Sequence, residues 1–516
     1  MLRKATPMRT VALCSALLLT TAVVAHGQPV PTETLRLSVD EAVRLALGQN
    51  TDLAVERLAP AVTQARLASV SRLFTPVLST GVQKASQLQP PASLLLPTAT
   101  RTDVITTTVG ISERLPWLGS ALSVAWDSSR TTSNSFLNSY NPLLRAGLAV
   151  SVSQPLLRDL RTDAVRTQVA VARTAQTVAE AQVQEATVRT TTAVKSAYWN
   201  LVSARAAREA RRVSLQFADE LARANAARVE AGIAPPLDLV ASQAEVVSNR
   251  EQLLAADVAV HEAEDALRVL FNSSTDASLW QQSIEPTDAL PATTGPVNVD
   301  AAVEAALRGR VDLVRARADA ANAAATVRLT GSQRLPDVRL TGSYQANGLG
   351  GTEVLRSGGF PGTILGPGRT VTLGTVVDQI SQRSYPTWGL GITASYPLWK
   401  SSDDANHARA TVEASQAALR VRGAETRAVQ QVRDAGWKVD MSARRIETAA
   451  AARALAEQRR DTEQKRFDAG LSTSFLVIQA QRDLANATQN ELAARLAHHL
   501  AVVAFEAVQV TPSVAR

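Results

Sequence analysis

The chain carries one set of sequence landmarks twice. Four dipeptides near its start recur 260 positions later: Val39-Asp40, Ala42-Val43, Ala46-Leu47 and Asp52-Leu53 are matched by Val299-Asp300, Ala302-Val303, Ala306-Leu307 and Asp312-Leu313. Further along, Gln154-Pro155-Leu156 is matched by Tyr396-Pro397-Leu398, and Trp199 by Trp437, two residues that we expect to be packing anchors. Two unrelated Ala-rich stretches would not keep Pro and Trp in the same order. The pattern therefore predicts one structural module used twice.

These landmarks set the expected boundaries along the chain. We expect a signal peptide at 1–27, a first structural repeat at 28–285, a linker at 286–297, a second structural repeat at 298–511 and a C-terminal tail at 512–516. Each repeat should hold a helix, strands of a barrel and a long helical hairpin.

The first residues have the layout of an export signal. Arg3, Lys4 and Arg9 precede an apolar run at 11–24, and small residues follow it, so we expect cleavage near residue 27. Cys14 lies inside the run and follows Leu13 rather than a small residue, which favours a signal-peptide residue over a lipid-anchored one. Cleavage removes this single cysteine, so disulfides and thiolate metal sites are not expected. It also lowers the formal charge from +7 by the three basic residues, to +4, too little to indicate nucleic acid binding.

Two long helical hairpins are predicted. Residues 156–231 contain neither Gly nor Pro, and they would span roughly 110 Å as one helix. Their apolar and Ala residues recur in alternating steps of three and four, as in helices that pack along their length. Gly232 and the prolines that follow should end this helix, and 237–271 should return beside it. In the second half, a helix at 402–469, a turn at 470–474 and a return helix to Val508 repeat the arrangement.

Between the helical parts, apolar residues recur at every second position. Leu148, Val150 and Val152 alternate with small or polar neighbours, and 338–344 and 388–396 do likewise. A soluble sandwich shows the same alternation, but it has many short strands at regular spacing. A few strands beside very long helices in an exported chain favour strands with lipid on one side and water on the other. A barrel cannot be closed by this small number of strands alone. We therefore expect the barrel to be shared between chains.

The first half has more strand-like sequence than the second. The candidate strands are 76–88, 103–113, 120–130 and 143–153, with a hairpin turn at 115–119. The sequence leaves open whether residues 103–131 add strands to the barrel or form an outer loop. The Gly- and Pro-rich segment 347–384 of the second half is expected to be an outward-facing loop.

No pattern in the chain indicates catalysis. There is no phosphate-binding Gly-Lys-Ser/Thr loop, no His-Glu-x-x-His motif and no Ser, His and Asp constellation, and the adjacent His498 and His499 point in different directions on a helix. We therefore expect no enzyme activity, no catalytic residues, no metal site and no cofactor. Beyond the signal, no apolar run reaches the length of about 18 residues that a transmembrane helix needs.

Taken together, these residues resemble the TolC family of outer-membrane efflux and secretion channels. The resemblance is carried by the paired openings 37–47 and 299–307, by Leu335-Pro336 before a strand, by the two Pro-Leu segments after strands and by two Arg-x-x-Ala-Gly turns ending at Gly232 and Gly470. It implies an α+β membrane protein: a homotrimer in the cell outer membrane, with a shared β-barrel continuous with a long periplasmic α-helical barrel. Members usually give four strands per chain to a barrel of twelve. It also implies a periplasmic adaptor and an inner-membrane pump as partners.

The same resemblance implies roles for the hairpin tips. The tip and adaptor-contact positions would be Arg228, Gly232, Ile233, Arg466, Gly470 and Leu471, with the side chains exposed. Asp238, Leu476 and Gln479 would line the tunnel entrance, where other members often carry acids at the second-hairpin positions, so a double acidic ring is not implied. Asp238 follows two prolines, and it could equally cap its helix and favour the helix dipole.

The expected function is an exit duct of a tripartite efflux system, through which small molecules pass passively while an inner-membrane pump supplies the energy. A type I protein secretion duct could use the same tunnel. A periplasmic coiled-coil structural protein is the alternative from another class.

Overall fold

The computed structural model describes residues 34–91, 98–271, 277–289, 295, 297–359, 362–399 and 401–511. The expected signal peptide at 1–27, the tail at 512–516 and residues 290–294 and 296 of the expected linker lie outside the described residues.

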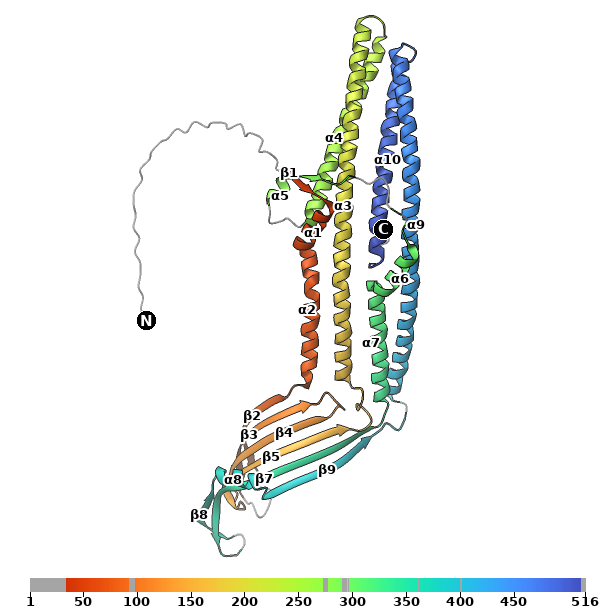
Figure 1. Cartoon of the computed structure of the whole chain (residues 1–516). Coiled ribbons are helices and arrows are strands. Elements are labelled where there is room, and N and C mark those ends of the chain that lie inside the picture. Colours follow the sequence, from red (N-terminus) through yellow and green to blue (C-terminus); the bar gives the residue numbers. More distant parts are fainter. Residues whose placement is uncertain are drawn as a thin grey trace, which may run out of the picture.

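Two long helical hairpins stand side by side on a tilted β-sheet (Figure 1). The first hairpin is α3 (Ala164–Glu230) with α4 (Pro236–Phe271), and the second is α9 (Ser402–Asp468) with α10 (Ser474–Val508). Helices α3 and α9 each have 67 residues, about 100 Å at the usual rise per residue. Near the sheet, α2 (Thr51–Ser71) packs against α3, and α7 (Val311–Gln333) packs against both α3 and α9. The predicted hairpins are therefore present.

The first long helix begins eight residues later than the first Gly-free and Pro-free residue. Asp163 precedes α3 with an extended backbone, and its Oδ1 accepts a hydrogen bond of 2.7 Å from the Arg166 amide. This side chain satisfies an amide at the helix start that would otherwise lack a partner. Asp159 upstream has a positive φ of 63°, so the connection from the sheet is an irregular turn. Absence of Gly and Pro alone did not locate the start, whereas the cap did.

Short elements form a belt around the middle of the helices. They are β1 (Thr34–Leu37), α1 (Val39–Gln49), α5 (Ala277–Gln281), β6 (Ser283–Pro286) and α6 (Val299–Gly309), and β1 pairs with β6 in parallel. Ser38 and Glu41 form a capping box at the start of α1, which explains the Leu-Ser-Val-Asp-Glu opening of the chain.

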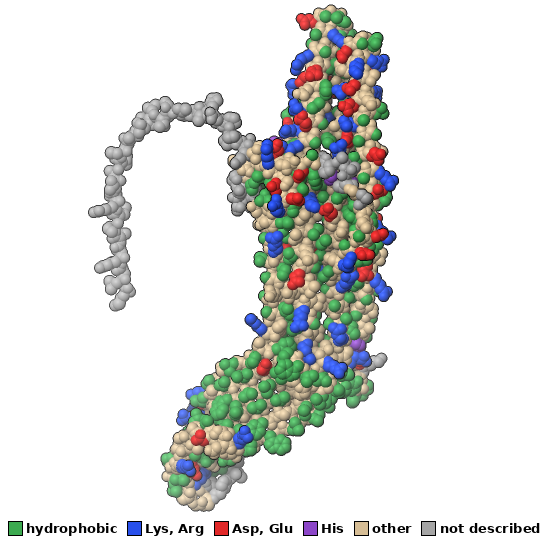
Figure 2. Space-filling view, viewed as in Figure 1, with side chains coloured by type: hydrophobic (Ala, Val, Ile, Leu, Met, Phe, Trp, Pro, Cys, Tyr) green, Lys and Arg blue, Asp and Glu red, His purple; other side chains and the backbone are tan. Residues whose placement is uncertain are grey.

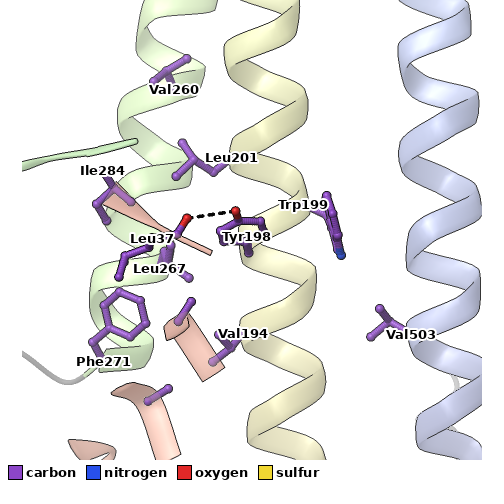
Figure 3. Close-up of a cluster of buried hydrophobic side chains, with 12 residues drawn as sticks. Leu37, Val194, Tyr198, Trp199, Leu201, Val260, Leu267, Phe271, Ile284 and Val503 are labelled. Atoms are coloured by element: carbon purple, nitrogen blue, oxygen red, sulfur yellow. Dashed lines mark hydrogen bonds between the residues drawn. The ribbon is translucent and has the colours of Figure 1, made fainter. Parts of the chain in front are cut away.

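The largest hydrophobic core lies at this belt (Figure 3). Tyr198 is fully buried there, and its hydroxyl donates to the Leu37 carbonyl at 3.0 Å. Burial raises the pKa of Tyr198 to about 12. Trp199, on the neighbouring position of α3, points toward α10 and stacks on His499 with ring centroids 5.0 Å apart. Trp199 is thus a packing anchor, as predicted.

Trp437 does not share this role within the chain. Its side chain lies on α9 and is 64% exposed, whereas Trp199 is 9% exposed. Within a single chain the structure therefore does not show Trp437 as a packing anchor, and its expected packing role stays a prediction. The two tryptophans occupy matching positions, but only the first has another hairpin of the same chain beside it.

Six long strands follow one another across an antiparallel sheet. Their order is β2 (Val77–Gln89), β3 (Thr100–Arg114), β4 (Ala121–Ser133), β5 (Tyr140–Pro155), β7 (Asp337–Ser357) and β9 (Tyr385–Ser395). The hairpin β3–β4 lies inside this sheet, between β2 and β5, so residues 103–131 form strands of the sheet and not a loop outside it. Its turn at 115–119 has positive φ angles at Leu118 and Gly119.

The two faces of the sheet differ in polarity. One row of paired residues is entirely apolar: Leu78, Ile111, Val124, Val150, Tyr344 and Trp388. The adjacent row, which points to the opposite face, is small or polar: Ser79, Gly110, Ala125, Ala149, Gln345 and Thr387. Figure 2 shows hydrophobic side chains covering the sheet on the face turned to the viewer. The predicted alternation is thus present across all six strands.

The segment 347–384 is not the loop that its Gly and Pro content suggested. Strand β7 continues through it to Ser357, β8 (Thr363–Val371) pairs with this extension, and α8 (Leu373–Ser381) follows. Val376 of α8 approaches the sheet so closely that a Cβ at Gly348 would lie 2.5 Å from the Val376 carbonyl oxygen. Part of the glycine content therefore serves close packing of a helix on a sheet.

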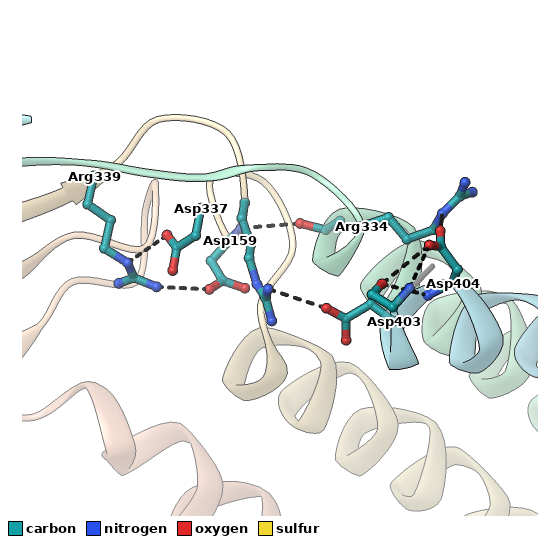
Figure 4. Close-up of polar contacts among 9 residues, drawn as sticks. Asp159, Arg334, Asp337, Arg339, Asp403 and Asp404 are labelled. Carbon is teal, nitrogen blue, oxygen red and sulfur yellow. Dashed lines mark hydrogen bonds and ion pairs between the residues drawn. The ribbon is translucent and has the colours of Figure 1, made fainter. Parts of the chain in front are cut away.

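A polar network joins the sheet to the helices (Figure 4). Arg339 at the start of β7 donates to Asp337 at 2.8 Å and to Asp159 at 3.4 Å, and Arg334 at the end of α7 donates to Asp404 at 2.8 Å. Asp404 also caps the first turn of α9, and the hydrogen bond to its carboxylate from the Ser401 amide, together with Arg334, lowers its pKa. The contacts link β7 to the loop before α3, and the end of α7 to the first turn of α9.

In the part of the chain that the structure describes, no helix combines the length and the apolarity needed to cross a membrane.

Candidate site at the hairpin tips

The first hairpin turns through a Schellman motif at Gly232. The Ile233 amide donates to the Arg228 carbonyl at 2.9 Å, and the Gly232 amide donates to the Val229 carbonyl at 3.0 Å. Gly232 has φ +70°, a conformation that costs little only for glycine. No atom lies within 4 Å of the place where its Cβ would be, so the backbone angle and not space requires this glycine.

The second hairpin has the same turn at Gly470. Leu471 donates to Arg466 at 2.7 Å, Gly470 donates to Phe467 at 3.0 Å, and φ of Gly470 is +75°. In both copies of the Arg-x-x-Ala-Gly motif, the arginine carbonyl accepts the closing hydrogen bond. The motif thus describes how a helix ends, and it places Ile233 and Leu471 just beyond the turn.

The tips present apolar side chains to the surroundings. Ile233 is 78% exposed and Leu471 is 73% exposed, as expected from the sequence. Leu237 and Phe475, at matching positions in the first turns of α4 and α10, add to this apolar end and were not singled out from the sequence. Arg466 is exposed and forms an ion pair of 3.0 Å with Glu463.

Arg228 differs from the expectation of an exposed tip residue. It is half-buried, its guanidinium carbon lies 4.0 Å from the centre of the buried Phe467 ring, and its Nη2 donates to the Phe467 carbonyl at 3.2 Å. The reason is that the second hairpin lies beside it. Arg228 therefore connects the two hairpins and also supplies a cation to the carbonyl end of α9.

The expected entrance residues lie a few positions beyond the two turns. Asp238 is in the first turn of α4, where it favours the helix dipole, and it is half-buried. Leu476 is 41% exposed in the first turn of α10, and Gln479 donates to Asp483 at 3.0 Å. Within one chain these three side chains belong to two separate helix starts.

A groove between the hairpins lies further from the tips. Its volume is about 460 Å³, and its lining includes Phe217, Glu245, Asn249, Gln252, Arg460 and Arg482. The Glu245 side chain, 7% exposed, accepts from Arg482 Nε at 3.0 Å and from Asn249 at 3.0 Å. The hydrogen bond from Arg482 to Glu245 and the negative charge of Glu245 raise the pKa of Arg482. Sequence reasoning missed this pair, because its partners lie 237 positions apart and no local pattern joins them.

In the described part of the chain, no three His, Cys, Asp or Glu side chains gather in a way that could hold a metal ion. The tips and the groove offer ion pairs, amides and apolar surface.

Residues 302–508 match the family model described as outer membrane efflux protein. The second half of the chain is therefore similar to the outer membrane efflux protein family. The chain also shares its fold with solved structures over nearly its whole length. A membrane protein from Pseudomonas aeruginosa matches with TM-score 0.65 and 16% identity, covering 93% of this chain and 92% of that one.

Two further structures give the same result. VceC from Vibrio cholerae matches with TM-score 0.62 and 16% identity, covering 92% of this chain and 96% of that one. The open state of the MtrE channel of Neisseria gonorrhoeae matches with TM-score 0.60 and 16% identity, covering 94% of each chain. No curated relative matches the sequence. The chain therefore has the fold of these outer-membrane channel structures, as its resemblance to the TolC family implied.

Proposed function

We propose that this chain is an outer-membrane efflux channel and serves as the exit duct of a tripartite efflux system. The observation that carries the proposal is the join between an amphipathic sheet and two 67-residue helices: one apolar sheet face suits lipid, and the helices are long enough for a periplasmic passage. Small molecules would pass passively, and an inner-membrane pump would supply the energy.

In this proposal the protein is a homotrimer. The six long strands that the described residues form across the sheet are fewer than the eight or so that a closed spanning barrel needs. Other copies would therefore complete the apolar sheet in a shared β-barrel. The helices of the copies would continue it as an α-helical barrel on the periplasmic side. The two sequence repeats, 28–285 and 298–511, would each supply one hairpin, with 286–297 linking them after removal of the signal peptide.

The tips would meet a periplasmic adaptor. Ile233 and Leu471 are exposed apolar side chains on rigid turns, which suits contact with a partner, and Gly232, Gly470 and Arg466 shape and flank the same surface. Arg228 would act between the hairpins. Asp238, Leu476 and Gln479 would line the entrance once the copies assemble.

The first experiment separates transport substrates. A strain lacking the gene is tested for drug susceptibility and for secreted proteins. Increased susceptibility with normal secretion supports efflux, whereas lost secretion with unchanged susceptibility supports a type I protein secretion duct. Soluble periplasmic recovery as a monomer without detergent, measured by size-exclusion chromatography with light scattering, would instead support a coiled-coil structural protein.

The second experiment tests the tips. The variant Ile233→Glu with Leu471→Glu should keep the trimer but lose co-purification with the adaptor and fail to complement the deletion. The matched control is Leu365→Glu, an exposed leucine in β8 at the opposite end of the molecule, which should complement normally. Normal complementation by the tip variant would contradict the adaptor role.

A further inference from the structure

The sheet has two open edges, β2 and β9. Within the described residues, β2 pairs only with β3, and β9 pairs only with β7. All 13 residues of β2 are exposed, and apolar side chains on both strands stand free: Val82 76%, Trp388 75%, Leu390 72% and Ile392 68%. Long, exposed apolar edge strands are templates for pairing with another chain. Because every neighbour in the sheet is antiparallel and the number of strands is even, β9 of one copy and β2 of another run in opposite directions when placed side by side.

The sequence repeat gives the register of that pairing. Pro76 before β2 matches Pro336 before β7 at an offset of 260, and Pro155 at the end of β5 matches Pro397 after β9 at an offset of 242. The observed contact between β5 and β7 is therefore the counterpart, inside one chain, of a contact between β9 and the β2 of a neighbour. In that observed contact Ala146 is opposite Gly348. The offset of 242 takes Ala146 of β5 to Trp388 of β9, and the offset of 260 takes Gly348 of β7 back to Leu88 of β2. The pairing between copies therefore places Trp388 opposite Leu88.

The geometry of the sheet supports this register independently. It pairs residues of the same face, because Leu88 and Trp388 both belong to the face that carries Leu78. Within one chain, however, the row that begins at Leu78 ends at Trp388. If Trp388 pairs with Leu88 of the next copy, the row of paired residues is displaced by ten residues along the strands for each copy. Ten residues over six strands correspond to a strand tilt of about 49° at ~3.3 Å per residue and ~4.8 Å between strands. Closed barrels need a tilt of roughly 35–45°, so the transferred register lies close to a closing geometry.

We propose that each copy contributes all six strands to the shared barrel, with β9 pairing with β2 of the next copy so that Trp388 lies opposite Leu88. Three copies then close an 18-stranded sheet. This rests on the trimeric channel proposed above and departs from four strands per chain, because β3 and β4 are built into the sheet. Barrel diameter grows roughly in proportion to strand number, so the barrel is about 1.5 times as wide as one of twelve strands.

The helices point to the same neighbour. Trp199 stacks on His499 within the chain, and a shift of 238 positions takes this pair to Trp437 and His261. Helix α9 begins and ends 238 positions after α3 begins and ends. Trp437 is 64% exposed and His261 is exposed, so each lacks within its own chain the packing that Trp199 has. The neighbouring copy that receives β9 would bring its His261 to Trp437.

Cysteine cross-linking tests the register, in a Cys14→Ala background that leaves no other cysteine. The pair Leu88→Cys with Trp388→Cys, or its neighbour Gln89→Cys with Thr387→Cys, should give disulfide-linked dimers and trimers on oxidation of outer membranes. Both pairs are made because adjacent cross-strand sites alternate between close and wide spacing. The matched control is Leu78→Cys with Trp388→Cys, which lies about 33 Å out of register and should give no ladder.

A second pair tests whether the hairpin belongs to the sheet. Val124→Cys with Val150→Cys, opposite each other on β4 and β5, should form a disulfide within each chain of the trimer. A trimer that lacks this disulfide, that cross-links through Leu78 instead of Leu88, or that cross-links at neither register overturns the inference and leaves the proposed channel intact. Recovery of a soluble monomer overturns the proposed function as well.

Discussion

At the hairpin tips, a backbone conformation with positive φ requires glycine at positions 232 and 470. Gly232→Ala and Gly470→Ala should each cost about 1–2 kcal/mol, the strain of placing a side chain in the left-handed region. No steric clash adds to this, since nothing lies near either Cβ position. Thermal unfolding followed by far-ultraviolet circular dichroism measures the loss.

The control is Gly48→Ala, inside the helix α1 with equally open space around it. This change should stabilise by roughly 0.5–1 kcal/mol, because alanine favours a helix over glycine. Equal effects at Gly48 and Gly232 would contradict the role assigned to the turn.

His498 makes the helical part sensitive to acid. Burial, with a smaller effect of the neighbouring His499, lowers the pKa of His498, and its Nδ1 lies 3.0 Å from the Ser442 hydroxyl. A histidine whose folded pKa lies below its unfolded value of about 6.5 binds its proton less readily in the folded state. The free energy of unfolding should therefore fall as pH drops from about 6.5 toward the lower folded pKa. Chemical denaturation at several pH values should show a flatter profile for His498→Gln, and an unchanged profile would exclude this histidine as the cause.

At the scale of elements, the groove between the hairpins is held by a charge pair of unequal exposure. Arg482→Gln leaves the buried Glu245 carboxylate with Asn249 but without its cation, which should cost about 1–3 kcal/mol. Arg308→Gln, in an ion pair with Glu304 whose side chains are both at least 75% exposed, should change stability by less than about 1 kcal/mol. Urea denaturation compares the two, and equal losses would show that burial of Glu245 is irrelevant.

Most helices and strands could be predicted from the sequence. Where the prediction placed an element or its end wrongly, there was a physical reason. Gly232 and Gly470 mark helix ends because the required φ excludes other residues, and alternation at Leu148 to Val152 marks a strand because the two faces differ in polarity. The start of α3 depends on the Asp163 cap, a local feature that the absence of Gly and Pro does not report. Gly348 was expected in a loop, but it lies in β7 and allows α8 to approach the sheet. In the sequence these two kinds of glycine look the same.

Contacts between distant elements could not be predicted in this way. Arg228 was expected at an exposed tip and instead lies against Phe467, and Glu245 finds Arg482 on the other hairpin. Both depend on how two hairpins lie side by side, which no periodicity within one helix reports. The entrance residues Asp238, Leu476 and Gln479 remain predictions for the same reason, since their role depends on neighbouring copies.

At the scale of the whole molecule, the two tryptophans should act at different levels. Trp199→Ala removes a buried ring from the core of the chain and should lower the stability of each chain by about 3–5 kcal/mol. Trp437→Ala should leave the chain stable but lower the temperature at which the proposed trimer dissociates. Heating in detergent followed by electrophoresis reports the trimer, and circular dichroism reports the helices. A Trp437→Ala trimer as heat-stable as the unchanged protein would contradict the packing of Trp437 against a neighbour.

The equal length of α3 and α9 limits how this protein can change during evolution. Inserting seven residues into each helix of the first hairpin alone would carry its tip about 10 Å beyond the tip of the second hairpin. Arg228 would then no longer reach Phe467, and the two turns would no longer end at one level. Length changes in the hairpins should therefore be inherited in matched pairs, one in each half of the gene, whereas the strands of β3 and β4 could be gained by one half alone.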